Sequence, residues 1–185
     1  MLNKQFFFDT VRSLLFNGKL KQTQVDGLNA ILNEWESKHA KKDDRFLAYM
    51  LATTYHETDT TMQPIEEYGK GKGKKYGKPD AVTGKEYYGR GYVQLTWKDN
   101  YQKMSKETGE DLVNNPELAL SNPIATKILF AGMLKGMFTG KKLSDYFNQT
   151  KQDWVNARRI INGIDKANVI ADYAKKFYQS ISHTV

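Results

Sequence analysis

Residues 44–60 read DRFLAYMLATTYHETDT, and this stretch predicts an amphipathic helix. Asp43 or Asp44 is a suitable start, because an aspartate side chain accepts hydrogen bonds from the free N–H groups at a helix N-terminus. The pattern ends between Thr58 and Thr60. Residues at steps of three and four form one broad face that we expect to be buried: Phe46, Leu47, Met50, Leu51, Thr54 and Tyr55.

Glu57 is an unusual residue for its position on this helix. At 100° per residue it shares the direction of Phe46 and Met50 within roughly 20°, so it should face the interior or its edge. Burial and the negative end of the helix would raise its pKa and keep it protonated near neutral pH, as a general acid requires. The alternative is that the helix has already frayed where it reaches residue 57. Glu57 is then a solvated acid or an ion-pair partner of Lys70 or Arg90.

Helical spacing of apolar residues also predicts helices over 7–15, 23–35, 123–138, 150–161 and 165–181. Thr23 is the expected N-cap of the second of these. Residues 63–91 differ, because they hold two prolines, seven glycines and six lysines, and they predict a loop-rich lobe. Residues 92–97 predict a short extended segment with Gln94 and Thr96 on one face, followed by a capping box from Thr96 to Asp99.

The composition excludes several classes of protein. The chain has 185 residues, 39% of them hydrophobic, and no run of eighteen apolar residues, which indicates one globular domain over 1–185 and no membrane-integral function. Cysteine is absent, so disulfides and thiolate chemistry are excluded. The net charge of +7 favours polyanionic partners.

A second carboxylate follows Glu57 after nine or ten residues, at Glu66 and Glu67. If this segment is extended, adjacent side chains point to opposite faces and only one of the two faces Glu57. Two carboxyl groups on either side of a glycosidic bond are the working parts of a glycosidase. The alternative is a pair of solvated acids that balance the lysines after them.

Metal and nucleotide chemistry are not expected. His56 and Glu57 begin like a zinc-protease helix, but Thr60 stands where the second histidine ligand is required, and we expect no metal and no organic cofactor. Residues 69–75, GKGKGKK, lack the phosphate-loop pattern. These lysines, with Tyr68 and Tyr76, fit either nucleic-acid binding or a solvated surface, and a run of charge favours the solvated surface.

Three blocks in order resemble glycoside hydrolase family 19, the chitinase-like family: YHET at 55–58, EYG at 67–69 and YYGRGYVQLTWKDNY at 87–101. The chain also looks like the single-domain bacteriophage endolysins that share this module. DLVNNPELA at 111–119 and IING at 160–163 are similar to later blocks, so the resemblance covers about 51–177. The resemblance implies a mostly α-helical, lysozyme-like α+β fold, with a helical lobe and a loop-rich lobe (63–91) on either side of a cleft.

The resemblance also implies roles for individual residues. Glu57 matches the general acid, Glu67 the general base, and Thr96 the hydroxyl that positions water, although Thr96 also fits a helix cap. Gln94, Asn100 and Asn162 match positions that bind sugar or water, although each also fits a surface or turn residue.

Three further residues are expected beside the substrate. Arg90 is expected to pair with a glutamate, although a surface arginine needs no such role. Tyr88 fits either a sugar-stacking residue or core packing. We expect His56 near the substrate, either on the helix surface or behind the residues that touch the substrate, and not as a catalyst.

The implied reaction is hydrolysis of a β-1,4 bond in a GlcNAc-containing glycan with inversion, which requires carboxyl groups roughly 6.5–9.5 Å apart. The loop between the two acids is shorter than in plant chitinases, the cysteines of that family are absent, and residues 63–85 are rich in lysine. These differences favour peptidoglycan as the substrate, and an endolysin, over chitin. The rival from another class is a non-catalytic, basic wall-binding module.

The remaining expectations concern partners and location. We expect a monomer that acts on peptidoglycan strands, without nucleic acid and without a separate wall-binding domain. The last helix, with Phe177 among its apolar residues, either contacts an anionic membrane surface or packs in the core. The N-terminus lacks a signal-peptide pattern. Together with this, the resemblance to bacteriophage endolysins implies accumulation in the host cytoplasm until another protein, a holin, opens the inner membrane.

Overall fold

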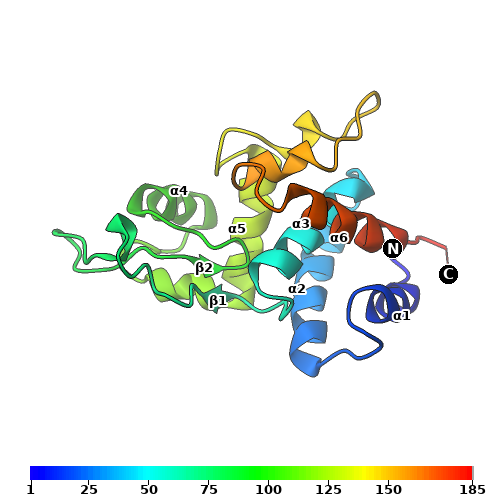
Figure 1. The fold of residues 1–185 in the computed structure, drawn as a ribbon, viewed down its shortest axis with the longest axis horizontal. Coiled ribbons are helices and arrows are strands. Elements are labelled where there is room, and N and C mark those ends of the chain that lie inside the picture. Colours follow the sequence, from blue (N-terminus) through cyan, green and yellow to red (C-terminus); the bar gives the residue numbers. More distant parts are fainter. Residues whose placement is uncertain (185) are drawn as a thin grey trace.

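The structure, a computed structural model, describes residues 1–184 and leaves Val185 outside the described part. Six α-helices and a small two-stranded sheet make up its main elements, which confirms the predicted mostly helical α+β fold (Figure 1). The elements are α1 (Lys4–Leu14), α2 (Gln22–Lys38), α3 (Asp44–Glu57), β1 (Ile65–Glu66), β2 (Arg90–Gly91), α4 (Lys98–Thr108), α5 (Asn122–Lys135) and α6 (Ala167–Gln179).

Helix α3 is the centre of the core. Asp43 caps its N-terminus by accepting a hydrogen bond from the N–H of Arg45, as the sequence indicates. Every residue from 47 to 55 is buried, so the helix is enclosed on all sides and not only on the predicted broad face. The cause is the number of neighbours, because α2, α5 and α6 all pack against it.

Helix α6 provides the largest part of this packing. Ile170, Ala174 and Phe177 are buried, and the ring of Tyr173 stands edge-on to that of Tyr55 at 4.9 Å between centroids. The core-packing alternative for the last helix therefore describes it, and Phe177 is not available to a membrane surface. In Figure 1 the N- and C-terminal ends lie close together beside this helix, where the N–H of Asn3 donates to the carbonyl of Ser182.

The small lobe lies at the left of Figure 1, on the same side as α4 and away from α1 and α6. Its strands β1 and β2 are antiparallel, with Ile65 opposite Gly91 and Glu66 opposite Arg90. The connection between them includes a 3₁₀ turn at Lys75–Gly77. The sheet places Glu67 directly after β1, at the base of this long connection.

Two local predictions were wrong for the same physical reason. In both places side chains form local hydrogen bonds that the periodicity of apolar residues does not reveal. Residues 150–161 form only a short 3₁₀ helix, Asn156–Ile160, because Asp153 accepts from the N–H and side chain of Asn156 in a turn. Helix α2 starts after Lys21 and not at Thr23, with the Gln24 side chain accepting from the Lys21 N–H.

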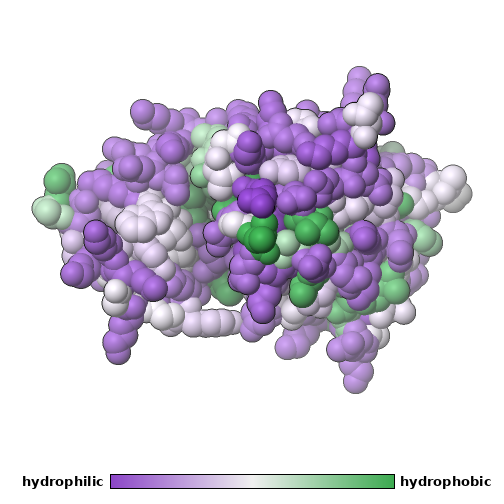
Figure 2. All heavy atoms as spheres, turned by 45° about the horizontal axis from the view of Figure 1, so that its top comes forward, coloured by the Kyte–Doolittle hydropathy of each residue, from purple (hydrophilic) through white to green (hydrophobic). Residues whose placement is uncertain are grey.

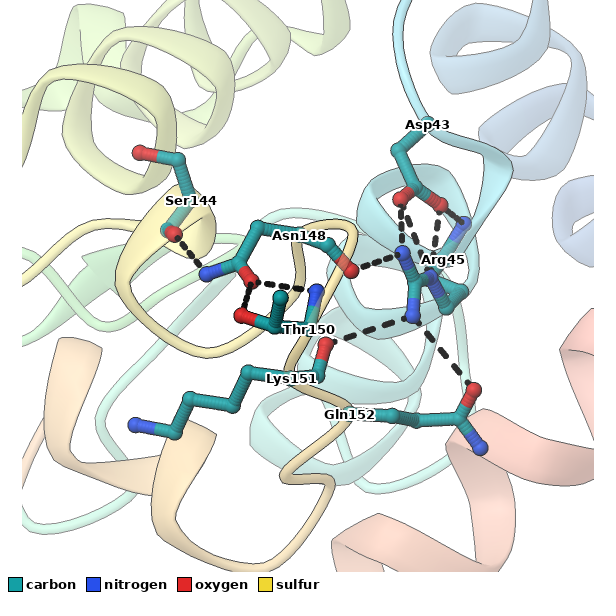
Figure 3. Close-up of polar contacts among 7 residues, drawn as sticks. All are labelled: Asp43, Arg45, Ser144, Asn148, Thr150, Lys151 and Gln152. Atoms are coloured by element: carbon teal, nitrogen blue, oxygen red, sulfur yellow. Dashed lines mark hydrogen bonds and ion pairs between the residues drawn. The ribbon is translucent and has the colours of Figure 1, made fainter.

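The segment between α5 and α6 is fastened to the start of α3 by Arg45. Its guanidinium pairs with Asp43 and donates to the carbonyls of Asn148 (3.0 Å) and Lys151 (3.3 Å). Figure 3 shows these contacts converging on the single arginine. The two hydrogen bonds to backbone carbonyls thus connect the N-terminus of α3 to a loop about a hundred residues later in the chain.

The surface seen in Figure 2 is mostly hydrophilic, with a small group of hydrophobic residues near its middle. None of the helices within residues 1–184 is both long and apolar enough to cross a membrane. The same residues contain no group of three or more histidine, aspartate or glutamate side chains placed to hold a metal ion.

Candidate active site

A cleft of about 370 Å³ is lined by residues of both lobes. Six of the nine predicted site residues line it: Glu57, Glu67, Gln94, Thr96, Asn100 and Asn162. Glu57 is the last residue of α3, whereas Glu67 follows β1 of the small lobe. The two carboxylates therefore reach one cleft from two different parts of the fold.

Glu57 is held by an arginine. Helix α3 continues through Glu57, so the frayed-helix alternative is wrong, and the side chain is only 16% exposed. Nη1 of Arg158 donates to Oε1 of Glu57 at 2.5 Å, while Nε of Arg158 donates to the carbonyl of Asp165 at 3.2 Å. Neither Lys70 nor Arg90 is its partner. Among residues 1–184 the second carboxylate oxygen of Glu57 accepts no hydrogen bond, which leaves it for a ligand.

Glu67 is held at both oxygens. The hydroxyl of Tyr76 donates to Oε1 and the N–H of Gly89 donates to Oε2, each at 3.1 Å. The N–H of Glu67 also donates to the carbonyl of Gly89 at 2.7 Å. Burial and the adjacent carboxylate raise the pKa of the Tyr76 phenol, so the phenol remains a donor near neutral pH.

Glu66 lies in a different environment from Glu67. Its carboxylate accepts from the hydroxyl of Tyr88 at 2.8 Å and pairs with Lys70 at 3.0 Å. These contacts, the Tyr88 hydrogen bond first, hold the pKa of Glu66 below its usual value. Glu66 does not line the cleft, and Glu67 does.

Gln94, Thr96 and Asn100 form a connected set along one side of the cleft. Nε2 of Gln94 donates to the carbonyl of Ile65 at 3.1 Å, which ties residue 94 to β1. The hydroxyl of Thr96 donates to the carbonyl of Gln94, and Nδ2 of Asn100 donates to the carbonyl of Thr96. Each side chain thus uses a donor to hold the backbone, and among residues 1–184 its acceptor oxygen accepts no hydrogen bond.

This turn replaces the extended segment predicted for residues 92–97. Gln94 and Trp97 both have positive φ, 53° and 75°, so the chain reverses and the alternation of faces is lost. Trp97, with no side-chain cap, is the residue that precedes α4, so the predicted capping box from Thr96 to Asp99 is wrong. Asn162 lies across the cleft, where its Oδ1 accepts from the N–H of Gly163.

The other three predicted residues do not line this cleft. Arg90 is buried, with its guanidinium 3.7 Å from the ring centre of Tyr88 and 3.1 Å from the hydroxyl of Tyr101. Its glutamate partner is Glu66, at 3.7 Å. Arg90 and Tyr88 are both buried and form one layer in contact with this carboxylate. His56 is half-buried beside Glu57 and Arg158, and burial lowers its pKa, which favours the neutral imidazole.

Four side chains at the cleft were missed from the sequence: Tyr76, Trp97, Phe138 and, behind Glu57, Arg158. Trp97 is 49% exposed and stands edge-on to the ring of Tyr76, with 5.2 Å between centroids. No one-dimensional signal identifies Arg158, because it follows Glu57 by 101 residues. Tyr76 was visible only as an aromatic residue within a lysine run.

Comparisons with known proteins agree on one family. The model of the family described as "Chitinase class I" (glycoside hydrolase family 19) matches residues 36–134, more than half of the chain. Endochitinase A2 of Pisum sativum is 45% identical over 43 residues. That alignment spans 23% of this chain and only 13% of the pea protein, so the likeness to this curated relative is local.

Solved structures give the same fold over almost the whole chain. A bacterial family 19 chitinase matches with a TM-score of 0.65 and 22% identity, over 96% of this chain and 93% of the other. A class IV chitinase from Zea mays matches with a TM-score of 0.59 and 19% identity, over 95% and 90% of the two chains. On the family match, with this fold in agreement, the chain belongs to glycoside hydrolase family 19.

Proposed function

We propose that this protein hydrolyses β-1,4 glycosidic bonds of bacterial peptidoglycan by an inverting mechanism with two carboxyl groups, and that it acts as a lytic enzyme of the endolysin type. One observation carries the proposal: Glu57 and Glu67 line the same cleft, each placed by a different lobe and each oriented by hydrogen bonds. Two carboxyl groups with this arrangement suit the acid and the base of a glycosidase.

The reaction follows from these positions. Glu57, in its protonated form, gives its proton to the glycosidic oxygen while the bond between that oxygen and the anomeric carbon breaks. A water molecule attacks the opposite face of the sugar, and Glu67 takes its proton. The product has the inverted anomeric configuration, and no group is left attached to the protein.

Each neighbour of the two acids has a part in this proposal. Arg158 orients one oxygen of Glu57 so that the other faces the leaving group. Hydrogen bonds from Tyr76 and Gly89 orient the Glu67 carboxylate, which is to receive the proton of the attacking water. The oxygens of Thr96 and Asn100 are suitable acceptors for that water or for sugar hydroxyls.

Charge supports peptidoglycan over chitin as the substrate. Chitin is an uncharged polymer, whereas the peptides of peptidoglycan carry carboxylates that a protein of net charge +7 attracts. Chitin oligomers are the second candidate substrate, and the family match supports them.

Purified peptidoglycan and chitin oligomers, digested by wild type, Glu57→Gln and Glu67→Gln, test the proposal. We expect the wild type to release reducing sugars from peptidoglycan and each variant to lose at least about a hundredfold in rate, because each removes one proton-transfer group. Mass spectrometry identifies the new reducing end, and NMR recorded within minutes identifies its anomer. Release of peptides alone would contradict glycosidase action. A first-formed product with the same anomeric configuration as the substrate would contradict inversion.

The same experiment separates the enzyme from a wall-binding module. Cosedimentation with insoluble peptidoglycan measures binding without turnover. Wild-type protein that sediments with the wall but releases no soluble sugar would assign the protein to the binding class. Addition of the protein to chloroform-treated bacteria then tests lysis directly, with Glu57→Gln as the inactive control.

A further inference from the structure

The loop between β1 and β2 carries a clear excess of positive charge. Residues 68–86 contain six lysines and two acidic residues, which account for +4 of the net charge of +7. Lys70 pairs with Glu66, and Asp80 is occupied by Lys98. Five exposed lysines form no ion pair within residues 1–184: Lys72, Lys74, Lys75, Lys78 and Lys85. We call these five the loop lysines.

The loop has a defined shape that keeps these lysines outward. Its backbone crosses itself at Gly71 and Gly77, where a Cβ atom added to Gly77 would lie 2.2 Å from the carbonyl oxygen of Gly71. Further along, Asp80 accepts from the N–H groups of Val82 and Thr83 and pairs with Lys98 of α4. A charged segment fixed at two points is a built surface and not a frayed one.

Tyr76 connects this surface to the cleft. It lies between Lys75 and Gly77, yet its side chain points inward, donates to Glu67 and contacts Trp97. Lys74, Lys75 and Lys78 lie within two residues of Tyr76, which lines the cleft. Since consecutive Cα atoms are about 3.8 Å apart, these lysines begin within about 8 Å of the Cα atom of Tyr76. A glycan bound in the cleft would present its substituents to these ammonium groups.

We propose that the loop lysines bind the carboxylates of the peptide stems on a peptidoglycan strand whose sugar chain occupies the cleft. This inference rests on the proposed glycosidase function and adds the part of the substrate that is recognised outside the sugar. Lysine suits the task, because it places a hydrated point charge on a flexible stem and tolerates variable carboxylate positions. The loop therefore selects peptide-bearing strands over uncharged glycans.

The test compares two charge-matched variants in a Glu57→Gln background, in which binding is measured without turnover. The loop variant carries Lys74→Gln, Lys75→Gln and Lys78→Gln. The control carries Lys19→Gln, Lys41→Gln and Lys42→Gln, which remove the same charge from exposed sites in the helical part of the chain. The ligands are peptidoglycan freed of phosphate polymers and the same material after an amidase has removed its peptides.

We expect the loop variant to bind intact peptidoglycan about three- to tenfold more weakly than the control, with a flatter dependence on salt. On peptide-free glycan the loop and control variants should bind alike. Equal binding of the two variants to intact peptidoglycan would overturn the inference, as would an equal loss on the peptide-free glycan. Sugar release by the wild type is measured separately, so failure of the proposed hydrolysis is distinguished from failure of peptide recognition.

Discussion

Arg158 Nη1 lies 2.5 Å from Oε1 of Glu57, although the two residues are 101 positions apart in the chain. Arg158 itself is only 5% exposed and is fixed by the carbonyl of Asp165. The end of the central helix is thus joined to the segment that precedes α6. This contact decides in which direction the carboxyl group of Glu57 points.

Replacement of Arg158 by glutamine should lower kcat by about ten- to a hundredfold and change KM little, because a misdirected acid impairs the chemical step more than glycan binding. Arg158→Lys should recover part of the rate. Arg159→Gln is the matched control, since Arg159 is exposed and lies next in sequence. Steady-state kinetics on peptidoglycan, with the Tm of each variant, measure the effect. An equal fall in kcat for the Arg159 variant would contradict the positioning role.

Replacement of Tyr76 by phenylalanine tests the support of Glu67. The variant loses the hydroxyl that donates to Oε1 of Glu67 but keeps the ring that contacts Trp97. We expect kcat to fall by about threefold to thirtyfold with little change in Tm, because one of two orienting hydrogen bonds is lost. Tyr68→Phe, at an 80% exposed site, should leave kcat unchanged. The prediction fails if both variants keep the wild-type rate.

Gly77→Ala tests whether the shape of the loop matters. The new Cβ would lie 2.2 Å from the carbonyl oxygen of Gly71, so the crossing of the backbone must open. We expect destabilisation by about 1–3 kcal/mol, seen as a Tm lower by several degrees, together with lower activity as Tyr76 shifts. Gly69→Ala is the matched control, since nothing lies within 4 Å of its added Cβ. An unchanged Tm and rate in Gly77→Ala would show that the loop adapts freely.

The ion pair of Asp43 and Arg45 predicts a pH-dependent part of stability. The hydrogen bond from Arg45 holds the pKa of Asp43 below its usual value. Its stabilising effect is therefore present above about pH 4, the usual range of an unfolded aspartate, and is lost as pH falls further. Asp43→Asn keeps a residue that caps helix α3 but removes the charge.

Urea unfolding of wild type and Asp43→Asn, from pH 7 to pH 2.5, measures this effect. We expect the wild type to be the more stable at pH 7 and the difference to shrink below about pH 4. Hydrogen exchange at residues 148–152, which Arg45 holds in Figure 3, should be faster in the variant at pH 7. A difference in stability that is constant with pH would contradict the ionic contribution.

The positions of most helices could be predicted from the sequence, because apolar spacing and caps are local properties. The start of α3 at Asp43 and Asp44 is one example, and the end of α5 before Gly136, where the chain adopts a left-handed conformation, lies within three residues of the prediction. The same reasoning failed at Gln94 and Trp97. Their positive φ values accompany hydrogen bonds to residues far from them in the chain, from Nε2 of Gln94 to the carbonyl of Ile65 and from the N–H of Trp97 to the carbonyl of Tyr87, which no local pattern contains.

The sequence by itself determined the helical framework, the two acidic residues and, through its ordered motifs, the family. Only the tertiary structure decided that Glu67 and not Glu66 shares the cleft with Glu57, that Arg158 and Tyr76 hold the two acids, and that Arg90 belongs to a buried layer with Tyr88. The physical reason is that spacing along the chain sets which face of an element a side chain occupies. Its partners across the fold depend on how distant elements pack.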